Sequence, residues 1–498
     1  MKRNKFSLSH YQLSTMDMGY VLPIACYEVL PGDTIQHATS ALIRCTPLAT
    51  PPMHPVSIRI HHWYVPSRII WDEFEDFITG GDYGSVPPVH PYSILPTGWS
   101  AGDLGDHLGL PLNVDNLTFN ALPIRAYGLI INEHYRDQDL TPERVVSKAS
   151  GLDNTTTLTV ATANWQKDYF TQARPWAQKS PDISIPMNDA SVQSNGQAIT
   201  IAPQGAPTSY RNMTMTTGTP NVGYSGSAIT TTGNTVWGNQ TGLAAQTQAA
   251  AGTINQLREA FALQRYAEAR ARYGSRYTEY LRYLGVNSSD SRLQRPEYLG
   301  GGKTTLQFSE VLQTGPASDD GSQTVGEMFG HGMGSMRSNR FRRFFEEHGY
   351  VMSLMSVMPK PIYSQGISRM WLKSDKEDYF QKELEAIGQQ PIEKAEIFVD
   401  PVTYPTGAGD TWGWTNRYQE YKQIHSTVAN GFRPGALYDD WHFSRAFSAA
   451  PVLNDSFIRG PVTKRPFADQ TNNTLLVMAR HSIQARRMLQ KNPTPHVY

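Results

Sequence analysis

The chain has 498 residues, and its 44 lysines and arginines balance its 44 aspartates and glutamates. This balance excludes a strong overall field for a polyanion, so any nucleic-acid contact must be local. Charged residues make up only 18% of the chain, less than the usual quarter, which favours a loop-rich protein. Cys26 and Cys45 fit no metal spacing and are expected to be buried thiols in a reducing compartment. No run approaches the roughly 20 apolar residues of a membrane span, and the basic start lacks the apolar core of a secretory signal.

Several short runs between turn signals have the alternating pattern of β-strands. The clearest run covers residues 56–65, where one set of alternate side chains is Val56, Ile58, Ile60, His62 and Tyr64. A strand with one buried face has this pattern, which also puts His61 and His62 on opposite faces. We predict further strands over residues 35–45, 350–358 and 475–479. Strands so far apart along the chain indicate a β-core whose connecting loops are long.

The segment after residue 65 changes to a helical period. Its apolar stripe consists of Ile70, Phe74, Phe77 and Ile78, and the acidic side chains Asp72, Glu73, Glu75 and Asp76 lie elsewhere. We therefore predict a short helix over residues 71–78 with a solvated acidic face.

Residues 187–252 differ sharply in composition from the rest of the chain. They are rich in Thr, Ser, Gly, Asn, Gln and Ala, and their only formal charges are Asp189 and Arg211. Such a segment does not easily form a core of its own, although residues 199–201, 213–215 and 230–232 have β-propensity. We predict a surface insertion with irregular β-structure, and a disordered linker is the alternative.

Residues 254–284 form the clearest predicted helix. Thr253 and Gln256 have the capping-box pattern at its start, Gly285 supplies a stop, and Gly274 is expected to break or kink it. Arginines and tyrosines occur along its whole length. One interpretation is a basic, aromatic surface that meets nucleic acid. The other, which we favour, is a solvated charged face with tyrosines packed into the body.

Two further segments are candidates for contact with DNA. In residues 336–349, arginines alternate with phenylalanines, as in proteins that stack bases and pair guanidinium groups with phosphates. Because acidic residues follow directly, we favour packing or ion pairs between subunits for this segment, whose arginines include Arg340, Arg342 and Arg343. The C-terminal tail, residues 480–498, has no acidic side chain and is the better candidate. Its cations are Arg480, Arg486, Arg487 and Lys491.

Sequence motifs give no support for an enzyme. Residues 300–305, GGGKTT, lack the spacing of a phosphate-binding loop, because Glu297 stands where glycine is required, and we predict a tight loop after Leu299. Neither a nucleophile elbow nor a metal-binding histidine spacing occurs, so we assign no catalytic, metal or cofactor residue. Two alternative functions stay open: a single-stranded nucleic-acid-binding module, and a carbohydrate-active enzyme that uses acids such as Glu73 and Glu75.

A series of short sequence blocks runs in order through the chain. It includes EVLPGDT (28–34), LPIRAY (122–127), DYFT (168–171), SRLQRPEYLGGG (291–302) and DWHF (440–443). These blocks resemble the major capsid protein of gokushovirus-type microviruses, which are small single-stranded DNA phages. The resemblance covers most of residues 1–460 and is weakest in residues 187–252 and in the C-terminal tail.

The resemblance implies a mainly β fold, an eight-stranded antiparallel viral jelly roll with long inserted loops and a few helices, formed by residues 1–498 as one subunit. It implies a structural protein, many copies of which build an icosahedral shell around circular single-stranded DNA, assembled in the host bacterial cytoplasm. The implied partners are other copies of the chain, the packaged DNA, a small basic DNA-binding virion protein, a minor DNA pilot protein and a host cell-surface receptor.

The insertion at residues 187–252 corresponds in this resemblance to the family's variable surface loop, which is thought to face the host. Its low charge and its many hydroxyl and amide side chains suit adaptable contact with a receptor. The residues that we select there for host contact are Tyr210, Arg211, Tyr224 and Trp237.

Overall fold

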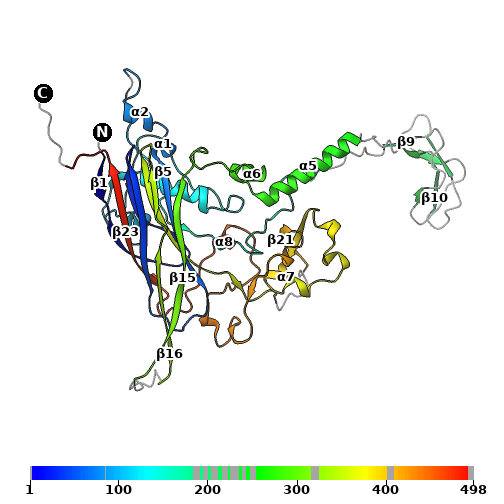
Figure 1. The fold of residues 1–498 in the computed structure, drawn as a ribbon. Helices are drawn as coiled ribbons and strands as arrows, with labels where there is room; N and C mark the ends of the chain where they lie inside the picture. Colours follow the sequence, from blue (N-terminus) through cyan, green and yellow to red (C-terminus); the bar gives the residue numbers. More distant parts are fainter. Residues whose placement is uncertain are drawn as a thin grey trace. The chain divides into compact units, whose positions relative to one another are not determined.

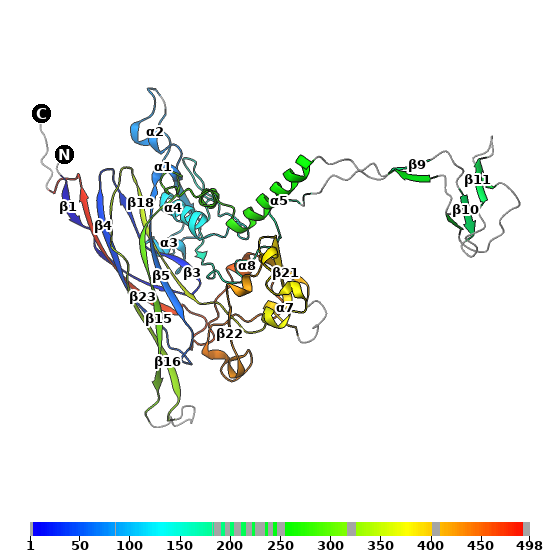
Figure 2. The same cartoon turned by 45° about the vertical axis from the view of Figure 1, so that its right-hand side comes forward.

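The computed structural model describes residues 3–84, 86–181, 183, 254–315, 325–400 and 409–491, together with the backbone of short strands between residues 191 and 246. It divides into two compact units, Met1–Lys179 with Arg270–Tyr498, and Ser180–Ala269. The first unit is built around an antiparallel sheet of 11 strands (Figures 1 and 2).

The strands of this sheet lie in the order β1-β23-β4-β16-β15-β5-β18-β3-β8, with β2 also paired to β23 and β17 to β4. Their bounds are β1 Asn4–Ser7, β2 His10–Met16, β3 Tyr20–Val29, β4 Thr34–Cys45, β5 Val56–Pro66, β8 Ala161–Thr162, β15 Glu297–Leu312, β16 Met328–Arg337, β17 Phe341–Phe344, β18 Gly349–Pro359 and β23 Leu475–Arg487. The strands predicted over residues 35–45, 56–65 and 350–358 are confirmed, and the strand predicted over residues 475–479 is longer than expected.

Strand β15 joins two layers, because its two halves have different partners. Residues 297–306 pair with β5, and residues 307–312 pair with β16. Ile43 of β4 and Val477 of β23 share one core with Ile58 of β5 and Val357 of β18. The sheet is therefore a sandwich of a first layer (β1, β2, β23, β4, β16 and β17) and a second layer (β5, β18, β3 and β8) (Figure 2).

The face predicted for β5 is confirmed. Its members Val56, Ile58, Ile60, His62 and Tyr64 are all buried between the two layers. His61 lies on the other side of the strand, as the alternation predicts, with its Nδ1 atom 2.7 Å from the hydroxyl oxygen of Tyr135.

A helix covers the far side of the second layer, and for this reason β18 is buried along its whole length. This helix, α4 (Leu122–Ile130), packs on β5, β18 and β3, and Tyr127 donates its hydroxyl to the carbonyl oxygen of Val21 at 2.7 Å. Arg125 of α4 is fully buried and forms an ion pair with Asp153 at 2.8 Å. Three structural layers thus stack in this unit: two of strands and one of α4 with its loops.

The other elements connect these layers or lie beside them. The remaining helices are α1 Ser67–Ile70, α2 Phe74–Thr79, α3 Leu104–His107, α5 Ile254–Tyr273, α6 Tyr277–Tyr283, α7 Lys394–Ile397 and α8 Asp455–Ile458. Short strand pairs are β6 Tyr92–Leu95 with β7 Leu117–Asn120, β19 Ile362–Tyr363 with β22 Ser426–Thr427, and β20 Gln389–Glu393 with β21 Thr411–Asn416. Short helical turns are η1 Ile131–Tyr135, η2 Arg369–Trp371, η3 Lys376–Asp378, η4 Lys382–Leu384, η5 Gln419–Tyr421, η6 Asn430–Phe432 and η7 Asp439–Trp441. In the described part of the chain, none of the helices is both long and apolar enough to cross a membrane.

The helix predicted over residues 71–78 begins later, at Phe74. Trp71 has an extended backbone and is fully buried, with its ring centre 4.9 Å from that of Phe77. Its indole N–H donates to the hydroxyl of Ser150 at 2.7 Å. Burial of this large ring in the core overrides the helical pattern before Phe74.

The tight loop predicted at residues 300–305 is wrong, because these residues belong to β15. A Cβ atom on Gly301 would lie 2.2 Å from the carbonyl oxygen of Ile60 and 2.9 Å from the hydroxyl of Tyr298. A bulge between Tyr298 and Gly300 adjusts the register. The glycines therefore mark close strand contact instead of a turn.

The break predicted at Gly274 is confirmed, since α5 ends at Tyr273 and α6 begins at Tyr277. Gly274 has a φ of +98° and Gly285, after α6, one of +81°, which glycine adopts without strain. Thr253, the predicted cap, lies outside the described residues.

The charged face of this region is exposed to solvent, as predicted, with Arg258, Arg265 and Arg272 among its exposed residues. Its tyrosines are not packed into the body, so that part of the interpretation that we favoured is wrong. Tyr273, Tyr277, Tyr280 and Tyr283 range from 40% to 65% exposed. They contact one another, with the ring centres of Tyr273 and Tyr283 4.7 Å apart, and α6 contributes no buried residue to a core.

Among its described residues, the second unit contains six short strands in two antiparallel groups. They are β9 Ser191–Ser194, β10 Thr200–Pro203, β11 Arg211–Met215, β12 Val222–Tyr224, β13 Thr235–Trp237 and β14 Leu243–Gln246. Strands β10 and β11 overlap two of the three runs of predicted β-propensity, and the third run, residues 230–232, lies outside the described residues. Of the residues selected for host contact, Arg211, Tyr224 and Trp237 lie on strands, and Tyr210 lies outside the described residues.

Candidate nucleic-acid interface

One face of the first layer is turned away from the core. Along β23, buried and exposed residues alternate from Leu475 to Arg486, and β4 shows the same alternation more weakly. Strand register aligns the outward residues in rows: Arg480 lies beside Ser40 of β4, and Ser40 lies beside Arg337 of β16.

Six exposed cations project from this side of the first layer, and we call them the basic sheet face. They are Lys5 on β1, Arg44 on β4, Arg337 on β16, Arg342 on β17, and Arg480 and Arg486 on β23. None of the six strands of this layer contains an aspartate or a glutamate. Within the described part of the chain, none of the six cations forms an ion pair, in contrast to neighbours such as Arg343.

This face stays positive although the whole chain has no net charge. Lys5 is the direct cross-strand partner of Arg486, and like charges in that position destabilise a sheet. The guanidinium carbon of Arg480 lies 5.7 Å from the ring centre of Tyr11, an electrostatic contact that leaves the charge in place. The arrangement therefore provides uncompensated charge for an anionic partner.

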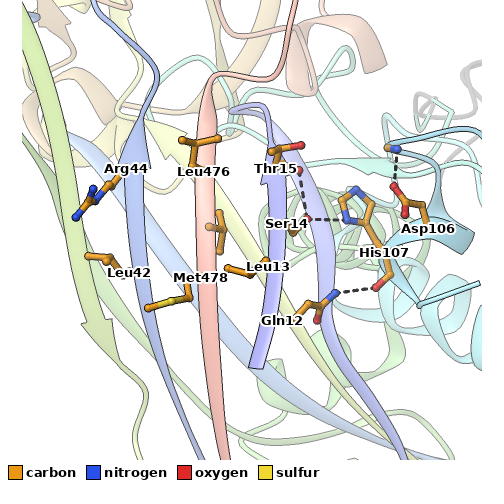
Figure 3. A pocket seen from close by; sticks show the side chains of 12 residues that line it. Gln12, Leu13, Ser14, Thr15, Leu42, Arg44, Asp106, His107, Leu476 and Met478 are labelled. Atoms are coloured by element: carbon orange, nitrogen blue, oxygen red, sulfur yellow. Dashed lines mark hydrogen bonds between the residues drawn. The ribbon is translucent and has the colours of Figure 1, made fainter. Parts of the chain in front are cut away.

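Exposed apolar side chains lie among these cations. Leu13, Leu476 and Met478 are 77%, 47% and 40% exposed. With Leu42 and Arg44 they line a shallow cavity of about 560 Å³ that runs across β4, β23 and β2 (Figure 3). Chemically, arginines bind phosphates and an apolar floor accepts unstacked bases, the combination found in single-strand binding.

Helix α3 closes one side of this cavity (Figure 3). The Nδ1 atom of His107 lies 3.1 Å from the hydroxyl oxygen of Ser14, and the amide of Gln12 donates to the carbonyl oxygen of His107 at 3.0 Å. Burial lowers the pKa of His107, so this side of the cavity carries no imidazolium charge at neutral pH.

Three of the arginines selected from the sequence lie on the basic sheet face. Arg342, Arg480 and Arg486 come from two distant segments, and the pairing of β17 and β23 with β4 brings them together. Arg340 is exposed in the turn after β16, and Lys491 is exposed beyond β23.

The other two selected arginines are engaged within the subunit. Arg343 forms an ion pair with Glu297 at 2.8 Å, and Arg487 forms one with Asp33 at 2.9 Å. The guanidinium of Arg487 also donates to the carbonyl oxygen of Glu28 at 2.8 Å. They are weaker candidates for DNA contact than their neighbours Arg342 and Arg486.

The prediction of a basic tail that begins at residue 480 is wrong for residues 480–487. They continue β23, because His481, Ile483 and Ala485 extend the buried alternation that starts at Leu475. The cations of this stretch are therefore held on a sheet at fixed positions.

Sequence reasoning missed Lys5, Arg44 and Arg337. Arg44 is a single cation in its strand, so no local cluster marks it. Lys5 belongs to the basic N-terminal run and Arg337 to the arginine-rich segment at residues 336–349, but neither was selected for DNA contact. The signal that was available is the lack of any acidic residue in residues 4–16, 34–45, 328–337 and 475–487.

A polar layer lies in the core between the two sheets, beneath the basic sheet face. His37 of β4, His62 of β5 and His481 of β23 are each 0% exposed. The Nε2 atom of His37 is 3.3 Å from Nδ1 of His481, and the hydroxyl of Thr39 lies within 3.1 Å of both atoms. Burial lowers the pKa of His37 to about 2, of His62 to about 3 and of His481 to about 4.

These buried imidazoles are neutral and add no charge to the face above them. In the described residues, no group of three or more His, Cys, Asp or Glu is arranged to hold a metal ion. The two acids considered for carbohydrate chemistry do not form a shared site. Glu73 accepts a hydrogen bond from Ser150, whereas the Glu75 side chain is 71% exposed and lies 3.6 Å from Arg68.

Comparison with known proteins identifies the family of this chain. Residues 1–495 match the family described as "Capsid protein (F protein)". The chain is 34% identical to "Capsid protein VP1" of Bdellovibrio phage phiMH2K, over 92% of this chain and 87% of that protein. It is 31% identical to "Capsid protein VP1" of Chlamydia phage 1 over 92% and 89%, and 29% identical to that of Spiroplasma virus 4 over 92% and 87%. The predicted resemblance to gokushovirus capsid proteins is confirmed, and the chain belongs to the capsid protein (F protein) family.

Proposed function

We propose that many copies of this capsid protein close into an icosahedral shell around circular single-stranded DNA, and that the basic sheet face contacts this DNA. The observation that carries the contact is the set of six exposed cations on strands without a carboxylate. Cations that neutralise phosphates release condensed counterions, so a local patch can bind DNA on a chain with no net charge.

We also propose that the sandwich is an elaborated eight-stranded jelly roll. Strands β2, β23, β4 and β16 in one layer and β15, β5, β18 and β3 in the other are the candidates for its eight strands. The long connections would then supply contacts between copies, because a closed shell requires several different patches on each subunit.

The remaining partners follow from the family. A small basic DNA-binding virion protein would neutralise DNA that the basic sheet face does not reach, and a minor DNA pilot protein would complete the particle, assembled in the host bacterial cytoplasm. The insertion at residues 187–252 would attach to a host cell-surface receptor. Deletion of residues 190–245 should leave shell formation intact and abolish attachment; loss of shells would instead give the insertion a role in assembly.

Particle analysis tests the assembly proposal. Purified particles should be uniform shells by electron microscopy and light scattering, with this chain as the dominant protein. A stable monomer as the only form in phage lysates would overturn the proposal.

Salt-dependent binding of a single-stranded oligonucleotide to the unassembled protein, followed by fluorescence anisotropy, tests the DNA contact. The double variant Arg342→Gln/Arg480→Gln should bind more weakly and reduce the slope of log affinity against log salt by about 1.4, roughly 0.7 per lost phosphate contact. Arg343→Gln is the matched control, because this neighbouring arginine is paired with Glu297, and it should bind like the wild type. Equal losses in both variants would refute the assignment to this face, and very tight binding by the monomer would favour a dedicated single-strand-binding module.

A further inference from the structure

A second candidate site is a cleft on the second layer of the sandwich. Its volume is about 780 Å³, enough for a small organic ligand. One wall is the side of β5 that faces away from the sandwich core, where Ser57, Arg59, His61 and Trp63 follow one another. Residues within 134–139, 163–167 and 274–279, which include the end of η1 and the start of α6, form the other side.

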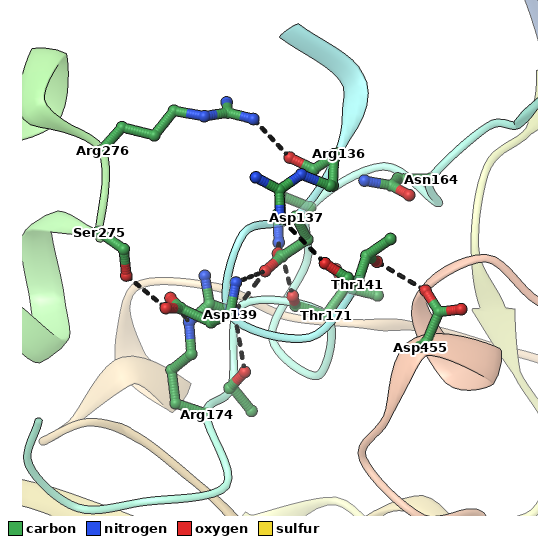
Figure 4. Close-up of polar contacts among 12 residues, drawn as sticks. Arg136, Asp137, Asp139, Thr141, Asn164, Thr171, Arg174, Ser275, Arg276 and Asp455 are labelled. Atoms are coloured by element: carbon green, nitrogen blue, oxygen red, sulfur yellow. Dashed lines mark hydrogen bonds and ion pairs between the residues drawn. The ribbon is translucent and has the colours of Figure 1, made fainter. Parts of the chain in front are cut away.

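The negative charges of the two aspartates at the base of this cleft are balanced by neighbouring cations (Figure 4). Asp137 pairs with Lys167 and, at 3.5 Å, with Arg174, whereas Asp139 pairs with Arg174 at 3.1 Å and with Lys179 at 2.7 Å. Burial acts to raise the pKa of both carboxyl groups, but these cations hold both pKa values below the ordinary range. Both aspartates are therefore ionised and engaged, and they do not compete for the other cations of the cleft.

Two cations on this face of the strands have no such partner among the described residues: Arg59, which lines the cleft, and Lys303, which lies next to Arg59 but outside the lining residues. Arg59 of β5 and Lys303 of β15 are register partners, so their side chains project from the same face. Like charges directly opposite each other destabilise a sheet, and no described carboxylate pairs with either residue. An anion held between the guanidinium and the ammonium would remove this repulsion.

Aromatic rings stand next to this pair of cations. His61 follows Arg59 on the same face of β5, and the ring of Tyr298 is centred 5.8 Å from that of His61 and 5.1 Å from that of Trp63. The hydroxyl of Tyr135 fixes this wall, 2.7 Å from Nδ1 of His61 and accepting from Nε1 of Trp63 at 3.3 Å. Tyr298 is 47% exposed, which leaves ring surface for stacking.

We propose that this cleft binds a nucleotide, with the phosphate at the edge of the cleft, between Arg59 and its neighbour Lys303, and the base stacked on Tyr298. Both cations can bind phosphate oxygens through charge-assisted hydrogen bonds, and an aromatic ring stacks with any base. A free nucleotide and a nucleotide within single-stranded DNA offer this same chemistry. The site does not depend on the basic sheet face, which belongs to the other layer.

The test titrates full-length, unassembled capsid protein with deoxyadenosine monophosphate and follows the fluorescence of Trp63 and Trp165, which both line the cleft. Saturable quenching is expected, and Arg59→Gln should weaken binding about tenfold to a hundredfold. Lys394→Gln, which removes a cation of α7 that is paired with Asp410 and lies outside both candidate sites, is the control and should bind like the wild type.

A charge-reversal variant separates loss of binding from loss of folding. Arg59→Glu places a carboxylate opposite Lys303, so thermal unfolding should occur at the same or a higher temperature while nucleotide binding is lost. Absence of saturable quenching in the wild type, or equal affinity in the wild type and Arg59→Glu, would overturn the site.

Two partial ligands test the placement of the base, and an oligonucleotide tests the source of the nucleotide. Inorganic phosphate and deoxyadenosine should each bind at least about tenfold more weakly than the nucleotide. If inorganic phosphate binds as tightly as the nucleotide, the stacking on Tyr298 is overturned. A short single strand that displaces the nucleotide from the Arg342→Gln/Arg480→Gln protein would assign the cleft to packaged DNA. If it does not displace the nucleotide, the cleft takes free nucleotides.

Discussion

Acidification should destabilise this capsid protein through the three histidines buried between the sheets. Burial lowers the pKa of His37 to about 2, of His62 to about 3 and of His481 to about 4, from an ordinary value of 6.5. Below pH 6.5 the unfolded chain therefore binds more protons than the folded protein. The stabilisation is fully present above pH 6.5 and is lost as the pH falls toward the folded pKa values.

The size of the effect follows from these pKa values. At pH 5, the loss amounts to about 2 kcal/mol for each histidine that stays neutral in the folded state. Three such histidines together lower the free energy of unfolding by about 6 kcal/mol, which is comparable with the 5–15 kcal/mol that stabilises a typical domain. The rings resist protonation chiefly because they are buried, and their closeness adds to this effect. The ring centres of His37 and His62 are 4.6 Å apart, and those of His37 and His481 are 5.4 Å apart.

Replacement of His62 by glutamine isolates one of these groups. The two ring nitrogens of His62 lie 2.7 Å from the hydroxyl of Ser353 and 3.0 Å from that of Ser338, and a glutamine amide can keep one of these hydrogen bonds. Urea unfolding, followed by tryptophan fluorescence at pH 7 and pH 5, measures the free energy of unfolding. Between these pH values the wild type should lose about 2 kcal/mol more than His62→Gln.

A control variant is needed because other buried histidines also make the stability depend on pH. His331→Gln changes an exposed residue of β16 and should lose as much stability as the wild type. Burial also lowers the pKa of His54, His61 and His134, each to about 4, so only the difference between wild type and His62→Gln belongs to His62. An equal loss in His62→Gln and the wild type would refute the reasoning.

Three further substitutions test the packing by urea unfolding at pH 7. Arg125→Met leaves Asp153 buried without its partner and should lower the free energy of unfolding by about 3–5 kcal/mol. Gly301→Ala brings a Cβ atom within 2.2 Å of the carbonyl oxygen of Ile60 and should cost about 1–3 kcal/mol. Trp71→Ala empties a fully buried site and should cost about 3–5 kcal/mol. The outward-facing Ser335→Ala is the control and should change little, and a similarly small change in any of the three would contradict the packing described.

The strands could be predicted where their signal is local. Alternation over residues 56–65 identifies both β5 and its buried face, and Gly274 marks the break between α5 and α6 by its own conformational freedom. The glycines at residues 300–302 could not be read in this way, because a turn and a close strand contact both favour glycine. Only the neighbouring carbonyl oxygen of Ile60, distant in the sequence, decides between the two.

The candidate site was only partly predictable for a related reason. Arg342 and Arg480 were selected because arginines are frequent in the segments around them. That they share a face depends on β17 and β23 both pairing with β4, a register that the sequence does not contain. Arg44 had no local signal at all, since it becomes part of the basic sheet face only through that same register.

The DNA contact that we propose for the basic sheet face has opposite consequences for the free subunit and for the subunit bound to DNA. Lys5 and Arg486 repel each other across the strands, which lowers the stability of the isolated protein. A polyanion that binds the folded subunit offsets this by mass action, because the unfolded chain does not hold the six cations on one surface. Arg486→Gln should therefore leave the subunit as stable as before or more stable, and weaken its binding to DNA. If a surface arginine served only solubility, its removal would not raise the stability of the subunit and weaken DNA binding at the same time. A gain in stability together with a loss of DNA affinity therefore distinguishes a binding face from ordinary surface charge.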